Sequence, residues 1–142
     1  THLNSFKNKL FASFPAEQQA RIKKVRERLL IGELASDFVT SNYQTISSNA
    51  TTQQISTAFF EQKSLYIEYC DEKKNYSKRR IEPHYLFLNW PVWYILAWDT
   101  DKDASRCFRL DRVQKATAEK EGFRLKKANT LMEEAEKYAK KL

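Results

Sequence analysis

Glycine, proline and cysteine are scarce in this 142-residue sequence, which contains two glycines, three prolines and two cysteines. A small secreted domain stapled by disulfides needs several paired cysteines, so Cys70 and Cys107 indicate free thiols in a reducing cytosol. No hydrophobic run approaches the roughly 20 residues that cross a bilayer, and no signal peptide opens the chain. These absences favour a cytoplasmic protein without a membrane segment.

The residues that are present allow a real hydrophobic core and give the chain a basic character. Hydrophobic residues make up 42% and aromatic residues 13%, which suits one compact domain with an appendage or two very small units. The formal net charge of +7 raises the chance of a nucleic acid or another polyanion as partner, although many basic proteins are merely soluble.

The first part of the chain carries a helical pattern over residues 15–31. Pro15 suits an opening position, Ile22, Val25 and Leu29 share one face, and Gly32 is a plausible stop. Lysine and arginine fill the opposite face. That face is interpreted as solvated, with a nucleic-acid contact as the alternative.

Two further helices are expected beyond this segment. Residues 36–54 read as an irregular or short-strand connector, from which Thr51 or Thr52 caps a short helix reaching about Gln62. The residues of that helix expected to pack inward are Ile55, Ala58 and Phe59, with Phe60 as a further candidate. A final helix is expected after Lys126.

From Ser64 onward the hydrophobic period changes to two and predicts strands in quick succession. They cover residues 64–70, 79–88, 91–98 and 105–113, with a fifth within 114–124. Pro83 marks an edge or a bulge, and the run PVWYILAW does not alternate, so both of its faces must be covered. The chain therefore reads as an α+β fold with an antiparallel meander, curled into a small barrel. With so few glycines, Asn75 and the aspartates must supply the unusual turn angles.

Motifs for metal binding and catalysis are weak. Asp99, Asp101 and Asp103 resemble the start of a calcium loop, but Ala104 and Leu110 stand where glycine and glutamate are needed, so a hairpin turn is expected. The cysteines and histidines form no close pair for zinc, and no serine sits in a nucleophile elbow. We therefore expect no metal, no cofactor and no enzymatic activity.

A set of arginine and aromatic residues remains in the strands. Guanidinium groups bind phosphate through paired hydrogen bonds, and flat rings stack on exposed bases. The alternative is that Arg109 pairs with Asp111 and Arg112 with Glu82, while most aromatic residues lie in the core. The candidate ligand-binding residues are Tyr69, Arg79, His84, Tyr94, Arg106, Arg109 and Arg112.

Three motifs in the right order give the segment from about Ile55 to Arg124 a resemblance to the WYL domain. The Trp-Tyr-Leu triplet of that family is present as Trp93-Tyr94-Ile95. Arg79-x-Ile81-x-Pro83 is similar to the Arg-x-Val-x-Pro element, and Arg106-Cys-Phe-Arg-Leu-Asp-Arg-Val113 is similar to the Arg-x-Phe-Arg-Leu-Asp-Arg-Ile signature. The sequence departs from the family at Pro83-His84-Tyr85-Leu86, where many members have Pro-Leu-Gly-Leu.

The resemblance implies a fold and a division of the chain. It implies a small Sm-like or SH3-like antiparallel barrel, with N-terminal linker helices and a C-terminal helix beside it. Residues 1–50 are then a linker with possible dimer contacts, residues 51–127 the WYL domain with its preceding helix, and residues 128–142 the last helix. WYL domains mostly follow a winged helix-turn-helix in bacterial transcription regulators, and that DNA-binding half is absent from this sequence. Because the chain starts at Thr1 and not at methionine, we expect a fragment of a longer regulator.

The resemblance also implies roles for single residues. Arg79, Arg106, Arg109 and Arg112 occupy the basic positions of the family and are candidates for ligand phosphates. Tyr69 and Tyr94 are candidates for stacking or hydrogen bonding, and His84 either tunes the ligand or fills space. The first hypothesis is an effector-binding domain that senses a nucleotide or a short single strand. The second is a direct nucleic-acid-binding module without a switching role.

Overall fold

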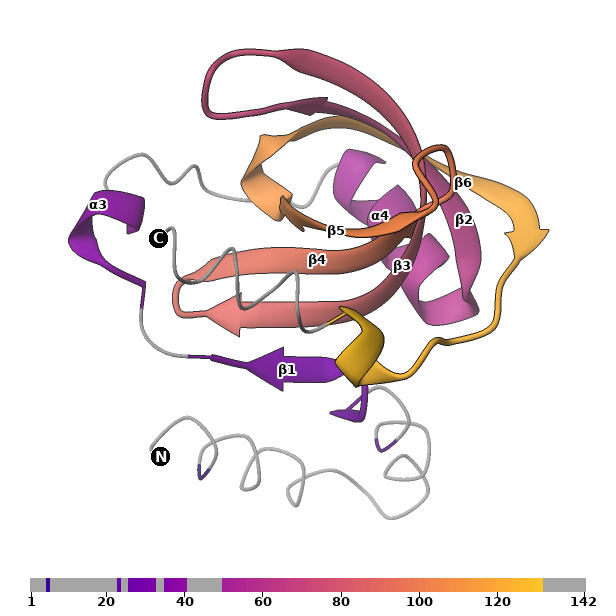
Figure 1. Ribbon diagram of the computed structural model, residues 1–142, viewed down its shortest axis with the longest axis horizontal. Coiled ribbons are helices and arrows are strands. Elements are labelled where there is room, and N and C mark those ends of the chain that lie inside the picture. The colour runs from indigo at the N-terminus through magenta and orange to yellow at the C-terminus, as the bar shows by residue number, and fades with distance from the viewer. Residues whose placement is uncertain (1–4, 6–22, 24–25, 33–34, 41–49, 132–142) are drawn as a thin grey trace.

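One bent antiparallel sheet and a helix packed against it dominate the computed structural model (Figure 1). The structure describes residues 5, 23, 26–32, 35–40 and 50–131. The elements are β1 (Leu29–Ile31), α3 (Asp37–Thr40), α4 (Ala50–Glu61), β2 (Lys63–Cys70), β3 (Tyr76–Asn89), β4 (Val92–Asp99), β5 (Ala104–Arg109), η1 (Leu110–Arg112) and β6 (Val113–Gly122). The α+β class and the run of strands after Ser64, including the fifth one, are confirmed. None of the described helices is long and apolar enough to cross a membrane.

The strands pair in the order β5-β4-β3-β2-β6, and β1 adds to β3 in parallel. All other pairs are antiparallel. Short turns join β2–β3, β3–β4 and β4–β5, whereas β6 returns to pair with β2 from the end of the run. The register between β3 and β4 shifts between Pro83 and Tyr85. This bulge confirms the interpretation of Pro83, whose nitrogen cannot donate to a ladder.

The expected closure into an Sm-like or SH3-like barrel is wrong in its last step. A barrel closes only when its two end strands hydrogen-bond to each other. Here β5 and β6 are the end strands, and no ladder joins them in the described part of the chain. The chain leaves β5 after six residues through the short helix η1, so it enters β6 without pairing along the outer edge of β5. The sheet is curled but open (Figure 1).

Both faces of β4 are covered, which explains why the run PVWYILAW has no polar side. Ile95 and Ala97 belong to a core between the sheet and α4, together with Ile55 and Ala58 of the helix. Val92, Tyr94 and Leu96 point the other way, into a second core that includes Leu131. Alternate residues of one strand thus face two different cores.

The helix α4 begins at Ala50, earlier than Thr52, and three of its four inward candidates are correct. Ile55, Ala58 and Phe59 are buried. Phe60 is 55% exposed, so its inward placement is wrong. Ile55, Ala58 and Phe59 share the inward face at spacings of three and four residues, and Phe60 lies about 100° further around the axis, beyond the edge of that face.

The expected helix over residues 15–31 is wrong at its end. Residues 23 and 26 are helical, whereas Leu29–Ile31 forms β1 and pairs with Leu86–Leu88 of β3. Pairing with a strand more than 50 residues later overrides the local helical spacing. Within the expected connector over residues 36–54, Asp37–Thr40 forms the short helix α3. Residues 50–54, the end of that connector, are already helical and belong to α4, whereas residues 15–22, 24–25 and 41–49 lie outside the described residues.

The last helix and the turns agree in part with expectation. Residues 128–131 are helical, and the remainder of the C-terminal helix lies outside the described residues. The hairpin turn after Asp99 is confirmed, because the buried Asp99 carboxylate accepts from the Asp101 and Lys102 amides. In the hairpin turns the positive φ angles fall on Lys74 and Asp103, and a third lies on Gln62 between α4 and β2. An aspartate therefore supplies one of these angles as expected, while Lys74 takes the position assigned to Asn75.

Gly32 continues the edge at which β1 joins the sheet and leaves no room for a side chain. Its amide donates to the Leu88 carbonyl at 2.8 Å. A Cβ atom there would overlap Asn89 Oδ1 and lie 2.6 Å from Cζ of Phe87. We expect Gly32→Ala to lower the free energy of unfolding by about 1–3 kcal/mol through overpacking, measured by urea denaturation. Gly122→Ala is the control, because its Cβ would make an ordinary 3.5 Å contact with Gln62 O, and an equal loss in both variants would contradict the prediction.

Candidate functional site

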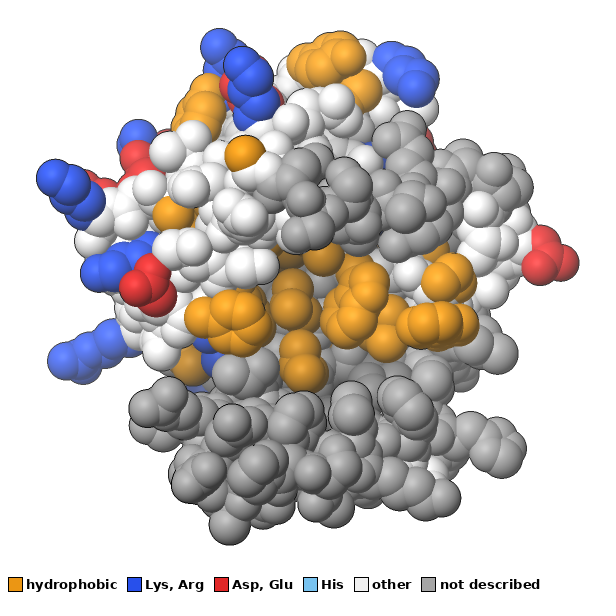
Figure 2. All heavy atoms as spheres, turned by 180° about the vertical axis from the view of Figure 1, so that it is seen from behind, with side chains coloured by type: hydrophobic (Ala, Val, Ile, Leu, Met, Phe, Trp, Pro, Cys, Tyr) orange, Lys and Arg blue, Asp and Glu red, His pale blue; other side chains and the backbone are white. Residues whose placement is uncertain are grey.

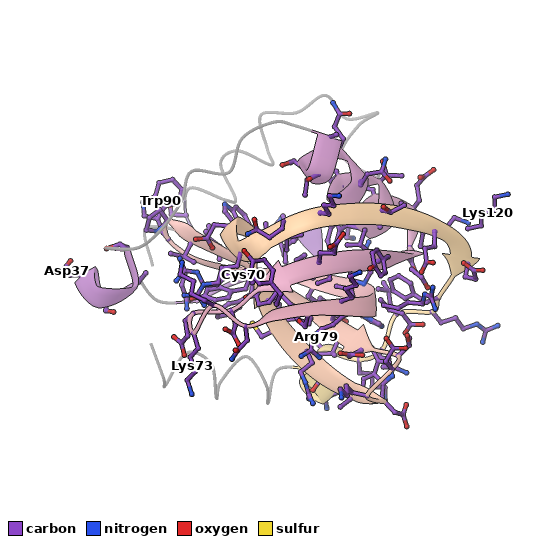
Figure 3. All side chains as sticks on the ribbon, turned by 90° about the horizontal axis from the view of Figure 1, so that it is seen from above. Asp37, Cys70, Lys73, Arg79, Trp90 and Lys120 are labelled. Carbon is purple, nitrogen blue, oxygen red and sulfur yellow. The ribbon has the colours of Figure 1, made fainter. Side chains whose placement is uncertain are left out.

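A pocket of about 390 Å³ lies beside the hairpin that joins β2 to β3, and we call it the arginine pocket. In Figure 3 this hairpin carries Cys70, Lys73 and Arg79, with Lys73 near its tip. Four of the seven predicted ligand-binding residues line the pocket. Its lining consists of Tyr69, Asp71, Glu72, Lys73, Asn75, Ser77, Arg79, Arg106, Cys107, Phe108 and Arg112.

Strand periodicity brings these side chains together from separate parts of the chain. Tyr69 of β2 lies directly opposite Ser77 of β3, so the two share a face, and Arg79 lies two residues further along that face. Arg106 and Phe108 of β5 are also two residues apart, so they share one face of that strand. The helix η1 then turns the chain and brings Arg112 to the pocket.

Arg79 is held in place by a buried acid. Its Nη1 donates to Asp99 Oδ2 at 2.7 Å, and its Nε donates to Ser77 Oγ at 3.3 Å. The Asp99 side chain is fully buried, whereas the Arg79 side chain keeps 26% of its surface exposed. The ion pair fixes the guanidinium plane, and the exposed part remains accessible from the pocket.

Arg106 and Arg112 supply two further guanidinium groups from the other wall. Both are half-buried, and Arg106 Nη1 donates to the neighbouring Ser105 carbonyl at 2.8 Å. Arg112 lies close enough to Tyr69 to affect its ionisation. Burial raises the pKa of the Tyr69 phenol, against the opposing effect of the Arg109 amide that donates to its oxygen at 3.0 Å. Tyr69 is therefore a neutral hydroxyl at pH 7.

An aromatic pair forms the apolar part of the arginine pocket. The rings of Tyr69 and Phe108 meet edge to face, with 5.0 Å between their centroids. The Arg79 guanidinium carbon lies 5.7 Å from the centre of the Phe108 ring. Cation and ring thus stabilise each other, which keeps Arg79 beside the apolar floor of the pocket.

The turn between β2 and β3 is locked by Asp71. Its Oδ1 accepts from the amides of Lys73 and Asn75, both at 2.9 Å, and its carbonyl accepts from the Lys74 amide at 3.0 Å. The hydrogen bond from the Asn75 amide, followed by that from the Lys73 amide, lowers the pKa of the Asp71 carboxyl. Four basic side chains line the pocket (Lys73, Arg79, Arg106 and Arg112) against two acidic ones (Asp71 and Glu72). An anion is therefore the ligand that this charge balance favours.

Arg109, predicted as a ligand-binding residue, does not line the arginine pocket. Its Nε and Nη2 donate to the two oxygens of Asp111, at 2.9 and 2.7 Å. Both side chains are only 1% exposed. The ion pair that the sequence offered as an alternative is thus confirmed. Arg109 falls on the opposite face of β5 from Phe108, and its charge is neutralised inside the protein.

Tyr94 and His84 also lie away from the arginine pocket. Tyr94 is fully buried in the second core, where burial raises its pKa. His84 is fully buried at the bulge of β3, with its ring centroid 4.7 Å from that of Phe123. Burial lowers the pKa of His84, and its Nδ1 lies 2.7 Å from the Glu82 carbonyl, which suits a neutral ring. Of the two roles considered for His84, the position supports filling space.

Several pocket residues were not singled out from the sequence. Lys73, Asn75 and Ser77 belong to a stretch that was interpreted only as a turn, and Phe108 was read as part of a strand. One signal was available: Arg79 and Ser77 share a face of any extended strand, and the turn must lie beside them. Cys107 lines the pocket beside Phe108, and no sequence feature pointed to it.

Comparison with known proteins agrees with the motifs. The model of the WYL domain family matches residues 50–118. Among solved structures, proteasome accessory factor B/C (PafBC) of Arthrobacter aurescens is 25% identical over 57% of this chain, with a TM-score of 0.47. This chain spans only 13% of the length of that protein. The matched segment begins at the first residue of α4 and ends within β6, so it contains the arginine pocket. Residues 50–118 therefore belong to the WYL domain family.

Proposed function

We propose that this chain is the effector-binding part of a bacterial transcription regulator and that the arginine pocket binds a phosphate-bearing ligand, a nucleotide or a single strand of nucleic acid. The observation that supports this most directly is the convergence of Arg79, Arg106 and Arg112 beside the rings of Tyr69 and Phe108. Guanidinium groups suit phosphate oxygens, and the rings suit a flat apolar moiety.

The positive charge of the chain alone does not select this pocket. On the face shown in Figure 2, basic side chains lie along the left and upper edges, several of them beside acidic ones, and hydrophobic side chains cross the middle. A broad basic surface would bind any polyanion, whereas a pocket with three guanidinium groups and an aromatic floor selects for phosphate joined to a ring. The second candidate function, nucleic-acid binding without switching, uses the same pocket.

A switching role requires the ligand to favour one of two arrangements of the regulator. In this proposal the DNA is bound by a winged helix-turn-helix in another part of the regulator. Residues before 51 provide the linker and candidate dimer contacts. The role is binding without turnover, so hydrolysis of a nucleotide by the chain would contradict it.

The test is a titration of a fluorescent 12-nucleotide single strand, the matching duplex and mononucleotides into the chain at several salt concentrations. We expect binding to weaken steeply with salt, and Arg106→Ala to raise the Kd about tenfold or more. Arg106 is the first choice because, within the described part of the chain, it forms no ion pair and its Nη1 donates to the carbonyl of the neighbouring Ser105. Arg79→Ala would in addition leave the buried Asp99 without its partner.

Arg80→Ala is the matched control. Arg80 is next to Arg79 on β3 but points away from the pocket, where it pairs with Glu119 at 2.7 Å. Arg80→Ala and Arg106→Ala each remove one positive charge from β3 or β5. If Arg106→Ala and Arg112→Ala bind the strand as tightly as Arg80→Ala does, the pocket is not the binding site and the proposed function fails.

A further inference from the structure

A second pocket, of about 250 Å³, lies on the other side of the β2–β3 turn, and we call it the Tyr76 pocket. The two pockets share Asp71, Glu72 and Arg112, so they are adjacent. Neighbouring lysines of the turn face opposite ways: Lys73 lines the arginine pocket and Lys74 the Tyr76 pocket. The turn, fixed by the hydrogen bonds to Asp71, is thus the wall between them.

The Tyr76 pocket differs from its neighbour in charge. Its basic residues are Lys74 and Arg112, and its acidic residues are Asp71, Glu72 and Asp111. Asp111 is already paired with the buried Arg109, so Lys74 and Arg112 are balanced by Asp71 and Glu72. This even balance does not favour a second phosphate. Carboxylate oxygens accept hydrogen bonds, so this pocket suits a group that carries N–H donors.

An exposed aromatic ring stands in the lining of this second pocket. Tyr76 is 76% exposed, the highest exposure among the large hydrophobic residues of the described chain. It begins β3 directly opposite Cys70 of β2, so the ladder fixes its backbone while the ring faces solvent. A ring held in this way is a stacking surface for a flat partner. Gln114 adds an amide that can both donate and accept.

We propose that the Tyr76 pocket holds a nucleobase bearing an exocyclic amino group, stacked on Tyr76, whose phosphate lies in the arginine pocket. Arg112 lines both pockets and bridges phosphate and base. The inference rests on the proposed function and makes it more specific. In this arrangement the ligand extends across the turn from the arginine pocket to the Tyr76 pocket. Cytosine, adenine and guanine are favoured over uracil and thymine, which have no exocyclic amino group.

The experiment compares three fluorescent 12-nucleotide strands, oligo-dC, oligo-dU and an abasic strand with the same phosphates, on the 142-residue chain. We expect Tyr76→Ala to raise the Kd for oligo-dC about 5- to 150-fold, the range of alanine substitutions under a stacked base. Tyr76→Phe should keep most of the affinity, because the ring remains. Oligo-dC should bind about fivefold more tightly than oligo-dU, as one additional hydrogen bond allows.

The controls separate this inference from the proposed function. Phe60→Ala removes another exposed ring, on α4, and should not affect binding. The abasic strand should lose affinity in Arg106→Ala but not in Tyr76→Ala. If Arg106→Ala weakens every strand while Tyr76→Ala weakens none, the base site is wrong and the phosphate site stands. Equal affinity for oligo-dC and oligo-dU would overturn the amino-group preference, and no effect of Arg106→Ala would overturn the proposed function itself.

Discussion

Asp111→Asn is expected to lower the free energy of unfolding by about 3–5 kcal/mol. The substitution keeps the size of the side chain but removes the charge that balances Arg109, and both side chains of the pair are 1% exposed. An arginine cannot release its proton at neutral pH, so an uncompensated charge stays inside the protein. Natural domains have only about 5–15 kcal/mol to lose, so the midpoint of urea denaturation should fall strongly.

The control is a second bidentate ion pair, Arg80 with Glu119, which lies at the surface. Arg80 donates to both oxygens of Glu119, at 2.7 and 3.1 Å, and its side chain is 54% exposed. Glu119→Gln should therefore leave the denaturation midpoint almost unchanged. The double variant Arg109→Met with Asp111→Asn removes both charges and should recover part of the loss. Equal effects of Asp111→Asn and Glu119→Gln would contradict the buried-charge explanation.

Arg28→Met is the second substitution with a large expected effect, a loss of about 3 kcal/mol or more. The buried guanidinium donates to three backbone carbonyls: Pro83 at 2.8 Å, His84 at 2.9 Å, and Phe59. It also lies over the Phe59 ring, 3.8 Å from its centre. Burial lowers the pKa of Arg28 to about 10, so the group is still charged at pH 7. Methionine matches its bulk but leaves the three carbonyls without this donor.

Two measurements and a control accompany Arg28→Met. The Leu86 amide donates to the Arg28 carbonyl at 2.9 Å, so its hydrogen exchange should accelerate more than the global loss of stability explains. Arg28→Lys keeps the charge but has fewer donors in different positions. Its free energy of unfolding should therefore lie between those of Arg28→Met and the native protein. Lys63 donates to the Lys120 carbonyl at the surface, and Lys63→Met should change little. A similar loss in Lys63→Met would show that the three buried carbonyls are not the cause.

The parts of the fold that the sequence predicted depend on short-range regularities. Alternation placed Leu65, Ile67 and Tyr69 on the buried face of β2, and the ring of Pro83 required a break in the ladder. The unalternating run of β4 required cover on both sides. Each of these inferences needs only the side-chain period and the hydrogen-bonding capacity of single residues.

The parts that the sequence did not predict depend on long-range pairing. The helical spacing of Leu29 with the residues before it is genuine, yet β1 pairs with Leu86–Leu88. The curl of the sheet followed from the order of strands, whereas its closure depended on where η1 redirects the chain. No local pattern specifies either outcome.

For the site, the sequence could identify the candidate arginines, but it could not separate those that line the pocket from those that are buried in ion pairs. Arg106 and Arg109 belong to the same strand and the same motif, yet one lines the pocket and the other is neutralised by Asp111. Which of them is available depends on the face that each occupies and on the turn of η1. Tyr94, likewise, shares the core with Leu96, because its face of β4 is covered.

The length of β3 has a structural consequence. Its 14 residues extend roughly 46 Å along the strand, at about 3.3 Å per residue. Ser77 and Arg79 are near the beginning, and Leu86–Leu88, which pair with β1, are near the end. Between them lies the bulge at Pro83, whose carbonyl accepts a hydrogen bond from Arg28. One continuous strand therefore joins the wall of the arginine pocket to the residues that pair with β1, with the Pro83 bulge between them.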